Sequence, residues 1–208
     1  ATMRGVRWAA VLIGFWACMS LAGVRPAQAA ERPAKTGIVL VAFGTSVPEA
    51  AAAYAAVEAR VRAAFPELPL RWAYTSSTVR AKLARQGRTL DSLETALARM
   101  MDESFTHVAV QSLHVVAGWE FLEMQRNAEA FGAMTGGFRR VAVGGPLLAA
   151  DADFDRVTRA LIANLPPGRR PEEAVVFMGH GTSHVSNAGY AALMVHLQRR
   201  DPRVFMGT

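Results

Sequence analysis

A strand that ends at a histidine between two glycines is indicated by the stretch Val175-Val176-Phe177-Met178-Gly179-His180-Gly181-Thr182-Ser183-His184. Its four apolar residues are typical of a buried strand, and the flanking glycines leave the imidazole of His180 uncovered. A similar stretch, Ile38-Val39-Leu40-Val41-Ala42-Phe43-Gly44-Thr45-Ser46, has Phe43 in the place of His180. The two stretches predict a duplicated α/β protein with chemistry between its halves, with coincidence as the alternative.

The first thirty residues have the pattern of a secretory signal peptide. Arg4 and Arg7 form a basic start, residues 8–23 are apolar and uncharged, and Ala27-Gln28-Ala29 is a small-x-small cleavage site. An N-terminal membrane anchor is the alternative, but such a span usually needs about 20 apolar residues. We therefore expect an exported, periplasmic protein that is not held in a membrane after cleavage.

Composition limits the ligands and partners of the mature protein. Cleavage would remove Cys18, the only cysteine, so a metal would have to be held by His, Asp, Glu or backbone oxygen. It would also remove three arginines and no acid, which lowers the formal charge from +6 to +3. Without a Lys/Arg tract, nucleic acid is not expected as a partner. A ligand with several carboxylates stays open, as does a homo-oligomer.

Apolar runs of strand length alternate with helical patterns along the rest of the chain. Strands are expected at 37–43, 70–74, 107–113, 140–143, 175–178 and 204–206, and helices at 47–65, 75–85, 89–102, 121–131, 151–165 and 188–198. This alternation predicts two similar α/β halves, each a parallel sheet with helices on both faces and an active-site cleft between them. We expect residues 31–150 to form the first half, 151–171 a connecting helix and linker, and 172–208 the start of an incomplete second half.

Parallel sheets of this kind bind ligands at the carboxyl ends of their strands. The segments that follow expected strands are Gly44–Ser46, Thr75–Ser77, His114–Glu120, Gly144–Leu148 and Gly179–His184. In the last of these, a neutral His180 imidazole could bind metal or accept a proton, or simply bond to a turn. His184 would pair with it at i, i+4 if a helix began at Thr182, whereas N-capping by Thr182 or Ser183 makes His184 a helix-start residue.

The segment after the third strand carries a second candidate cluster. His114 and Glu120 place an imidazole and a carboxylate in one loop, which suits capture of a divalent metal or a proton relay. The alternatives are a core histidine and a first-turn carboxylate stabilised by the helix dipole.

Other ionisable residues have weaker patterns. His107 and His196 are expected to be structural or solvated, with a haem or metal role open. Arg80, Lys82 and Arg85 are expected on a solvated helix face, with carboxylate binding as the alternative.

Six motifs are similar to those of the anaerobic, CbiK-type sirohydrochlorin cobaltochelatases, class II chelatases related to ferrochelatase. They are Leu40-Val41-Ala42-Phe43-Gly44-Thr45-Ser46, Tyr74-Thr75-Ser76, Gln111-Ser112-Leu113-His114, Gly118-Trp119-Glu120, Gly145-Pro146-Leu147-Leu148 and Val176-Phe177-Met178-Gly179-His180-Gly181.

The resemblance implies a cleft between the halves that takes a planar, carboxylate-rich tetrapyrrole and inserts Co²⁺ without ATP or an organic cofactor. It implies that His180 and Glu120 are catalytic and bind metal, with His114 as a further metal ligand. The residues that it implies for macrocycle binding are Phe43, Gly44, Thr45, Ser46, Thr75, Ser76 and Gly181. Relatives carry another histidine in a later Gly-Asp-His segment, so we expect the metal site to be completed beyond Thr208.

Three alternatives stay open from the sequence. One is ferrochelatase-type insertion of Fe²⁺, because His and carboxylate ligands accept several first-row ions. Another is an exported carrier of metal or tetrapyrrole, haem included, that uses the same cleft without turnover. The third is an α/β domain with an unrelated interaction role.

Overall fold

Strands and helices alternate in the computed structural model, which describes residues 33–208. The elements are β1 (Thr36–Ala42), α1 (Pro48–Ala64), β2 (Leu70–Tyr74), α2 (Ser77–Ala84), α3 (Leu93–Asp102), β3 (His107–Ser112), α4 (Trp119–Ala133), β4 (Arg140–Gly144), α5 (Asp151–Ala163), β5 (Val175–Met178), the 3-10 helix η1 (Val185–Asn187), α6 (Ala188–Arg200) and β6 (Val204–Gly207). The predicted α/β class is confirmed. The predicted signal peptide lies outside the described residues, and no described helix is long and apolar enough to cross a membrane.

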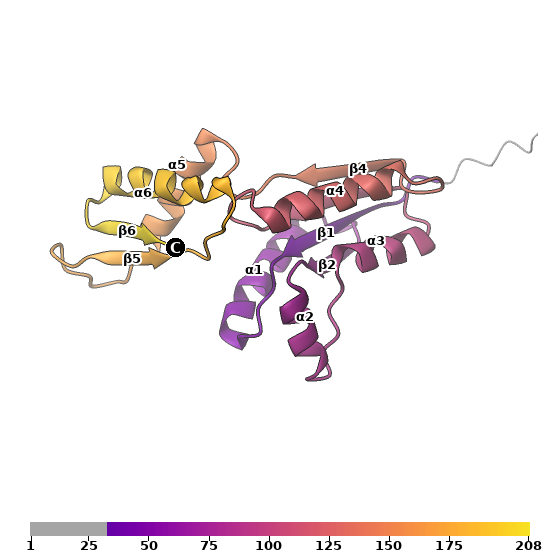
Figure 1. Cartoon of the computed structure of the whole chain (residues 1–208), viewed down its shortest axis with the longest axis horizontal. Helices are drawn as coiled ribbons and strands as arrows, with labels where there is room; N and C mark the ends of the chain where they lie inside the picture. Colours follow the sequence, from indigo (N-terminus) through magenta and orange to yellow (C-terminus); the bar gives the residue numbers. More distant parts are fainter. Residues whose placement is uncertain (1–32) are drawn as a thin grey trace, which may run out of the picture. The chain divides into compact units, whose positions relative to one another are not determined.

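The first sheet is parallel and has the strand order β2-β1-β3-β4 (Figure 1). Strand β1 lies inside it, and all of its residues from Gly37 to Ala42 are buried. Both faces of this strand are therefore covered, which explains why it reads as a continuous apolar run rather than as an alternating one. A Cβ at Gly37 would lie 2.6 Å from Met100 Cε, so even one added methyl group would overfill this core.

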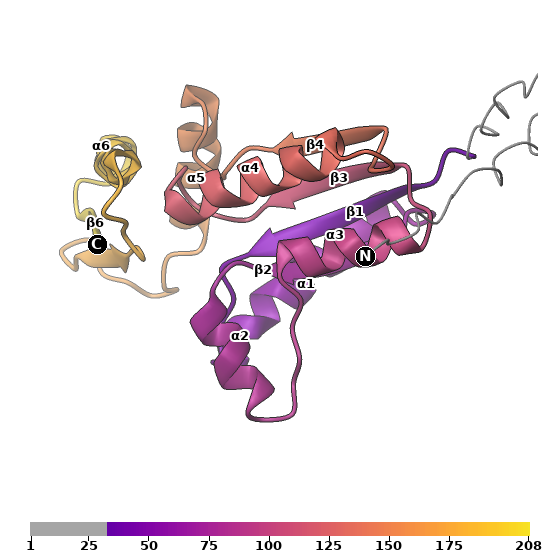
Figure 2. The same cartoon turned by 45° about the vertical axis from the view of Figure 1, so that its right-hand side comes forward.

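Helices α3 and α4 pack together over one face of this sheet (Figure 2). In α3, the buried residues follow the spacing of one helix face, and they join Val39 and Val41 of β1 in the core. The α3 residues concerned are Leu93, Ala96, Leu97 and Met100. This layer fixes β1 and β3, whose ends carry most of the candidate site.

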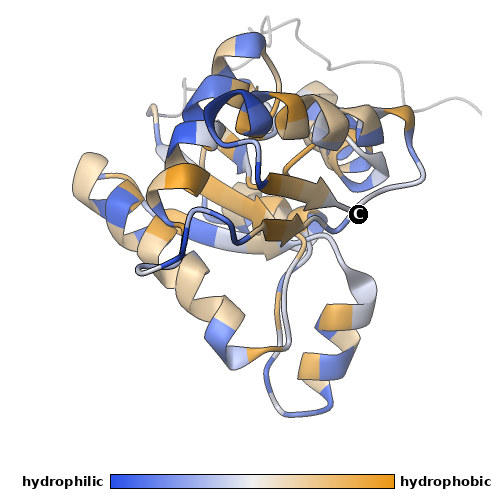
Figure 3. Cartoon of the chain, turned by 90° about the vertical axis from the view of Figure 1, so that its left-hand side faces the viewer, coloured by the Kyte–Doolittle hydropathy of each residue, from blue (hydrophilic) through white to orange (hydrophobic). Residues whose placement is uncertain are grey.

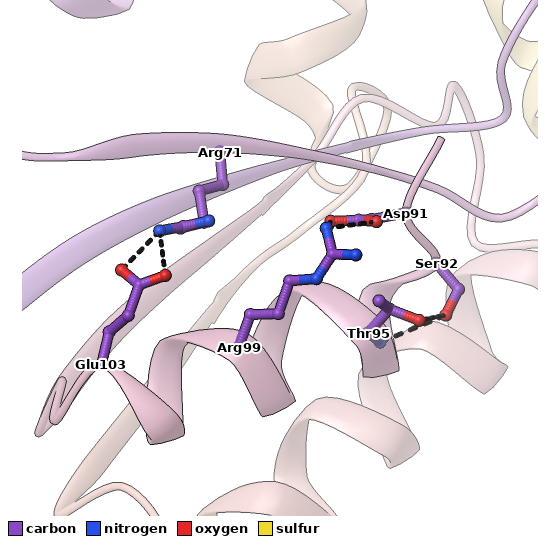
Figure 4. Close-up of polar contacts among 6 residues, drawn as sticks. All are labelled: Arg71, Asp91, Ser92, Thr95, Arg99 and Glu103. Atoms are coloured by element: carbon purple, nitrogen blue, oxygen red, sulfur yellow. Dashed lines mark hydrogen bonds and ion pairs between the residues drawn. The ribbon is translucent and has the colours of Figure 1, made fainter. Parts of the chain in front are cut away.

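Helix α3 begins later than its sequence pattern predicts, at Leu93 rather than Thr89. Ser92 is the N-cap, and its hydroxyl accepts a hydrogen bond from the Thr95 backbone N–H. Two arginines anchor the same helix: Arg99 pairs with Asp91, and Arg71 of β2 pairs with Glu103 (Figure 4). The capping side chain stops the helix from extending into residues 89–92.

The second sheet pairs β5 with β6 in parallel, and α6 packs against β6 (Figure 3). The prediction that β5 is buried is wrong for two of its residues, since Val176 is 61% exposed and Met178 is 80% exposed. Alternate side chains of a strand point to opposite faces, and only Val175 and Phe177 pack against the core that includes α6. The prediction that helices cover both faces of each sheet therefore holds for the first sheet. In the described part of the chain, one face of the second sheet is exposed at β5.

Candidate functional site

The ends of β1 and β2 are joined by backbone hydrogen bonds. Thr75 N–H donates to Ala42 O over 2.9 Å, and Ser76 N–H donates to Phe43 O over 3.1 Å. Ser76 also caps α2, because its hydroxyl accepts a hydrogen bond from Val79 N–H. The carboxyl ends of these parallel strands thus bring Phe43 beside Thr75 and Ser76, as the sequence predicts.

His180 contacts Phe43, its counterpart in the earlier stretch. The two ring centroids lie 4.8 Å apart with the planes inclined by 50°. The backbone beside His180 needs both of its glycines. A Cβ at Gly179 would lie 2.6 Å from Tyr190 Cε1, and Gly181 has a φ of +70°, in the left-handed region. The two predicted strand ends therefore meet in space.

The hydrogen bonding of His180 leaves one ring nitrogen with a lone pair. Its Nδ1 lies 3.0 Å from the carbonyl oxygen of Gly181, and a carbonyl can only accept, so Nδ1 carries the proton. Nε2 of the neutral ring is then unprotonated. The side chain is exposed at the strand end, so this nitrogen can take a proton or bind a metal ion.

His114 is more enclosed, and both of its ring nitrogens are engaged. Nδ1 lies 2.9 Å from Ser112 Oγ, and Nε2 lies 3.1 Å from Thr75 Oγ1. Burial lowers the pKa of His114, and the Glu120 carboxylate acts in the opposite direction with a smaller effect. Burial thus favours the neutral form of the His114 imidazole.

Glu120 lies in the first turn of α4, where the helix dipole favours a carboxylate. It also lines a cavity of about 80 Å³, together with Thr75, Arg80 and Glu94. This volume has room for several water molecules or a small ion. Glu120 is therefore both a helix-start residue and one of the groups that line this cavity.

His184 caps the 3-10 helix η1, as a helix-start residue would. Its Nδ1 accepts a hydrogen bond from Ser186 N–H over 3.2 Å. The chain from Gly179 to His184 is not helical, so the alternative of an i, i+4 metal pair with His180 is wrong. The expected caps at Thr182 and Ser183 are wrong as well, because His184 itself takes that position.

Trp119 is a site residue that sequence reasoning did not single out. It is 55% exposed, its ring meets that of His184 edge-on at 4.7 Å, and Nε1 donates to Ser183 Oγ over 3.3 Å. These contacts join the start of α4 to the loop after β5. The feature of the sequence that could have predicted this role is a large aromatic residue between Gly118 and Glu120, at the end of a strand-to-helix loop.

The three residues proposed as metal ligands do not form one centre. Across residues 33–208, no group of three or more His, Cys, Asp or Glu side chains is placed to hold a metal ion. The structure sets the ring of His180 against Phe43, whereas the ring of His114 bonds to Ser112 and Thr75. Metal binding by each of the three residues stays a prediction.

Comparison with known proteins assigns the family. The model of the cobalt chelatase (CbiK) family matches residues 36–208, which include every candidate described above. The chain belongs to the cobalt chelatase family.

Two curated cobalt chelatases illustrate the similarity. The chain is 45% identical over 174 residues to sirohydrochlorin cobaltochelatase CbiKC of Nitratidesulfovibrio vulgaris. The aligned region covers 84% of the chain and 61% of that relative. The chain is 34% identical over 174 residues to sirohydrochlorin cobaltochelatase of Salmonella typhimurium. Here the aligned region covers 82% of the chain and 64% of the relative. The chain thus spans less than two thirds of the length of these relatives.

The remaining ionisable candidates of this cobalt chelatase family member have local partners. His107 Nδ1 lies 2.9 Å from Thr106 Oγ1, and His196 lies near Asp155, at 3.4 Å. Arg80 donates to the carbonyls of Tyr74 and Thr75, and Lys82 donates to Ser46 Oγ over 2.9 Å. Lys82 and Arg85 are exposed, as predicted for a solvated helix face, whereas Arg80 is partly buried and supports the strand-end loop.

Proposed function

We propose that the protein inserts Co²⁺ into sirohydrochlorin without ATP or an organic cofactor. One observation supports this above all: the His180 ring lies at a strand end against Phe43, and its bond from Nδ1 to Gly181 O leaves Nε2 as the basic nitrogen of the neutral ring. The family match and the names of both relatives, sirohydrochlorin cobaltochelatases, support this substrate and this metal.

The chemistry requires a proton acceptor next to the ring. Each Co²⁺ that enters the macrocycle replaces two pyrrole N–H protons, so two protons have to leave for each ion bound. His180 Nε2 can accept one proton or hold the incoming ion, and the Glu120 carboxylate can accept a proton or bind the ion. We propose that each of these two residues is catalytic and can bind the metal ion.

The strand-end loops supply groups for a planar ligand that carries carboxylates. Phe43 offers an aromatic face, and glycines let backbone approach closely at Gly44 and Gly181. The hydroxyl-bearing residues beside them are Thr45, Ser46, Thr75 and Ser76. We propose that these seven residues contact the macrocycle.

We further propose that the protein is exported to the periplasm, on the sequence pattern of residues 1–30 alone. Cell fractionation with N-terminal sequencing of the purified protein tests this part. A mature chain that starts close to Glu31 in the periplasmic fraction supports export, and an uncleaved cytoplasmic chain contradicts it.

The activity is tested by mixing purified protein, sirohydrochlorin and Co²⁺ under anaerobic conditions and following the absorbance change of metal insertion. A rate well above that of the mixture without protein supports the chelatase. Parallel reactions with Fe²⁺ identify the preferred metal. Binding of the tetrapyrrole without a faster spectral change would favour a carrier instead.

A further inference from the structure

A chain of side chains joins the ends of β2 and β3 across the intervening end of β1. Ser112 is the last residue of β3, His114 follows it, and Thr75 follows β2. Because the strand order is β2-β1-β3, the imidazole of His114 bridges two strands that are not neighbours. Its two contacts, of 2.9 Å to Ser112 Oγ and 3.1 Å to Thr75 Oγ1, tie this part of the site together.

The hydrogen-bond directions in this chain follow from the partners of Ser112. Ser112 Oγ is fully buried and accepts a hydrogen bond from the backbone N–H of His114 over 3.1 Å. Among the described residues, His114 Nδ1 is the one acceptor within reach of the buried Ser112 hydroxyl proton, so we infer that this proton points to Nδ1. A neutral imidazole carries one proton, so that proton lies on Nε2, which donates to Thr75 Oγ1.

This arrangement leaves the Thr75 hydroxyl proton for another acceptor. Thr75 lines the same cavity as Arg80 and as three carboxylates, those of Glu94, Glu120 and Glu123. Within this lining the Arg80 guanidinium is the group next to Thr75, since it donates to Thr75 O over 2.9 Å. A hydroxyl donor beside a fixed cation is suited to an anionic oxygen. Carboxylates are the anionic oxygens of the proposed substrate.

We propose that His114 is a positioning residue rather than a metal ligand, and that it holds the Thr75 hydroxyl as a hydrogen-bond donor to a carboxylate of the tetrapyrrole. The second part rests on the proposed function, whereas the state of His114 does not. A metal bound at His114 would have to break its bond to Ser112 or to Thr75. His180 Nε2 is the imidazole nitrogen ready for a metal.

The role of Thr75 is tested by sirohydrochlorin titrations of Thr75→Val, Thr75→Ser and the wild type. Thr75→Val should weaken binding by about tenfold, the effect of one hydrogen bond to a charged group, and Thr75→Ser should restore it. Thr158→Val is the matched control, because Thr158 is buried on α5 and its hydroxyl has no partner among the described residues. Wild-type binding by Thr75→Val would overturn this role.

The state of His114 is tested by NMR on protein labelled with ¹⁵N at its five histidines. His114→Gln and His180→Ala assign the two imidazoles, and Zn²⁺ serves as a diamagnetic probe for the metal. We expect an Nε2–H tautomer for His114 that Zn²⁺ leaves unchanged, while the His180 Nε2 resonance shifts. A proton on Nδ1, or its displacement from Nε2 by Zn²⁺, would overturn the proposal. If the wild type binds no sirohydrochlorin, the chelatase function and the role of Thr75 both fail, but this spectrum still decides the state of His114.

Discussion

The imidazole of His180 lies against the phenyl ring of Phe43, with ring centroids 4.8 Å apart. Phe43 directly follows strand β1, and His180 follows strand β5 with only Gly179 between them. A tilted ring pair of this kind contributes about 0.5–1.5 kcal/mol beyond the apolar area that it buries. The contact orients a side chain that is otherwise exposed, and it leaves Nε2 to react.

Replacing Phe43 should therefore slow the reaction through His180. We expect Phe43→Leu to lower the rate of Co²⁺ insertion by about twofold to tenfold, which corresponds to the loss of the ring pair. Phe43→Tyr keeps the ring and should retain most of the rate. An unchanged kcat in Phe43→Leu would show that the contact does not position His180.

Gly179→Ala should destabilise the protein and disturb the same imidazole. The added Cβ would lie 2.6 Å from Cε1 of the buried Tyr190, so the strand end or the ring must move. Overpacking of this kind usually costs about 1–3 kcal/mol in the free energy of unfolding, which urea titration measures. Gly145→Ala is the control, since its Cβ would meet Ala149 Cβ at an ordinary 3.4 Å. Equal stabilities of the two variants would contradict the crowding at Gly179.

Thr158→Val should stabilise the protein. The Thr158 hydroxyl is fully buried and has no hydrogen-bond partner among the described residues, so it gives up water without gaining a bond. Valine has nearly the same shape, and we expect the free energy of unfolding to rise by about 1 kcal/mol. A lower stability would show that the hydroxyl is satisfied in solution, for example by water.

Stability should fall between neutral and mildly acidic pH, in part because of His114. Burial lowers the pKa of His114 in the folded protein below its ordinary value of 6.5. The unfolded chain therefore binds a proton first as pH falls, so this contribution to stability is complete above pH 6.5 and is lost toward the lower, folded pKa. Urea unfolding at pH 7.5 and 5.5 should show a smaller pH dependence in His114→Gln than in the wild type. The same dependence in both would contradict a depressed pKa.

The sequence predicts the strands and helices because burial imposes their periodicity on the residues themselves. The apolar run before Phe43 and the 3.6-residue spacing in α3 correspond to elements in the structure. The location of the site also follows from sequence, because parallel strands place their following loops at one edge of the sheet. The residues of a strand do not show whether another element packs on each of its faces. The apolar run of β5 therefore predicts burial of Val176 and Met178, although their face of the strand is exposed.

Details of the site that depend on distant partners could not be predicted. The bond between His114 and Thr75 joins residues 39 positions apart, and the sequence around each residue contains no pattern that predicts it. The contact of Trp119 with His184 similarly links the start of α4 to the loop after β5. By contrast, the capping of η1 by His184 is local. It was missed because Thr182 and Ser183 are the more usual caps.

We propose that His180 Nε2 accepts a proton or holds the ion during cobalt insertion, and the insertion rate of the His180→Ala variant decides whether it does. His196→Ala serves as the control, because His196 lies on α6 beside Asp155, and its loss should leave the rate near that of the wild type. Loss of a general base usually costs about 10²–10⁴-fold, so His180→Ala should show insertion close to the background without protein while still binding sirohydrochlorin. Insertion by His180→Ala at the wild-type rate would show that His180 is not a catalytic residue.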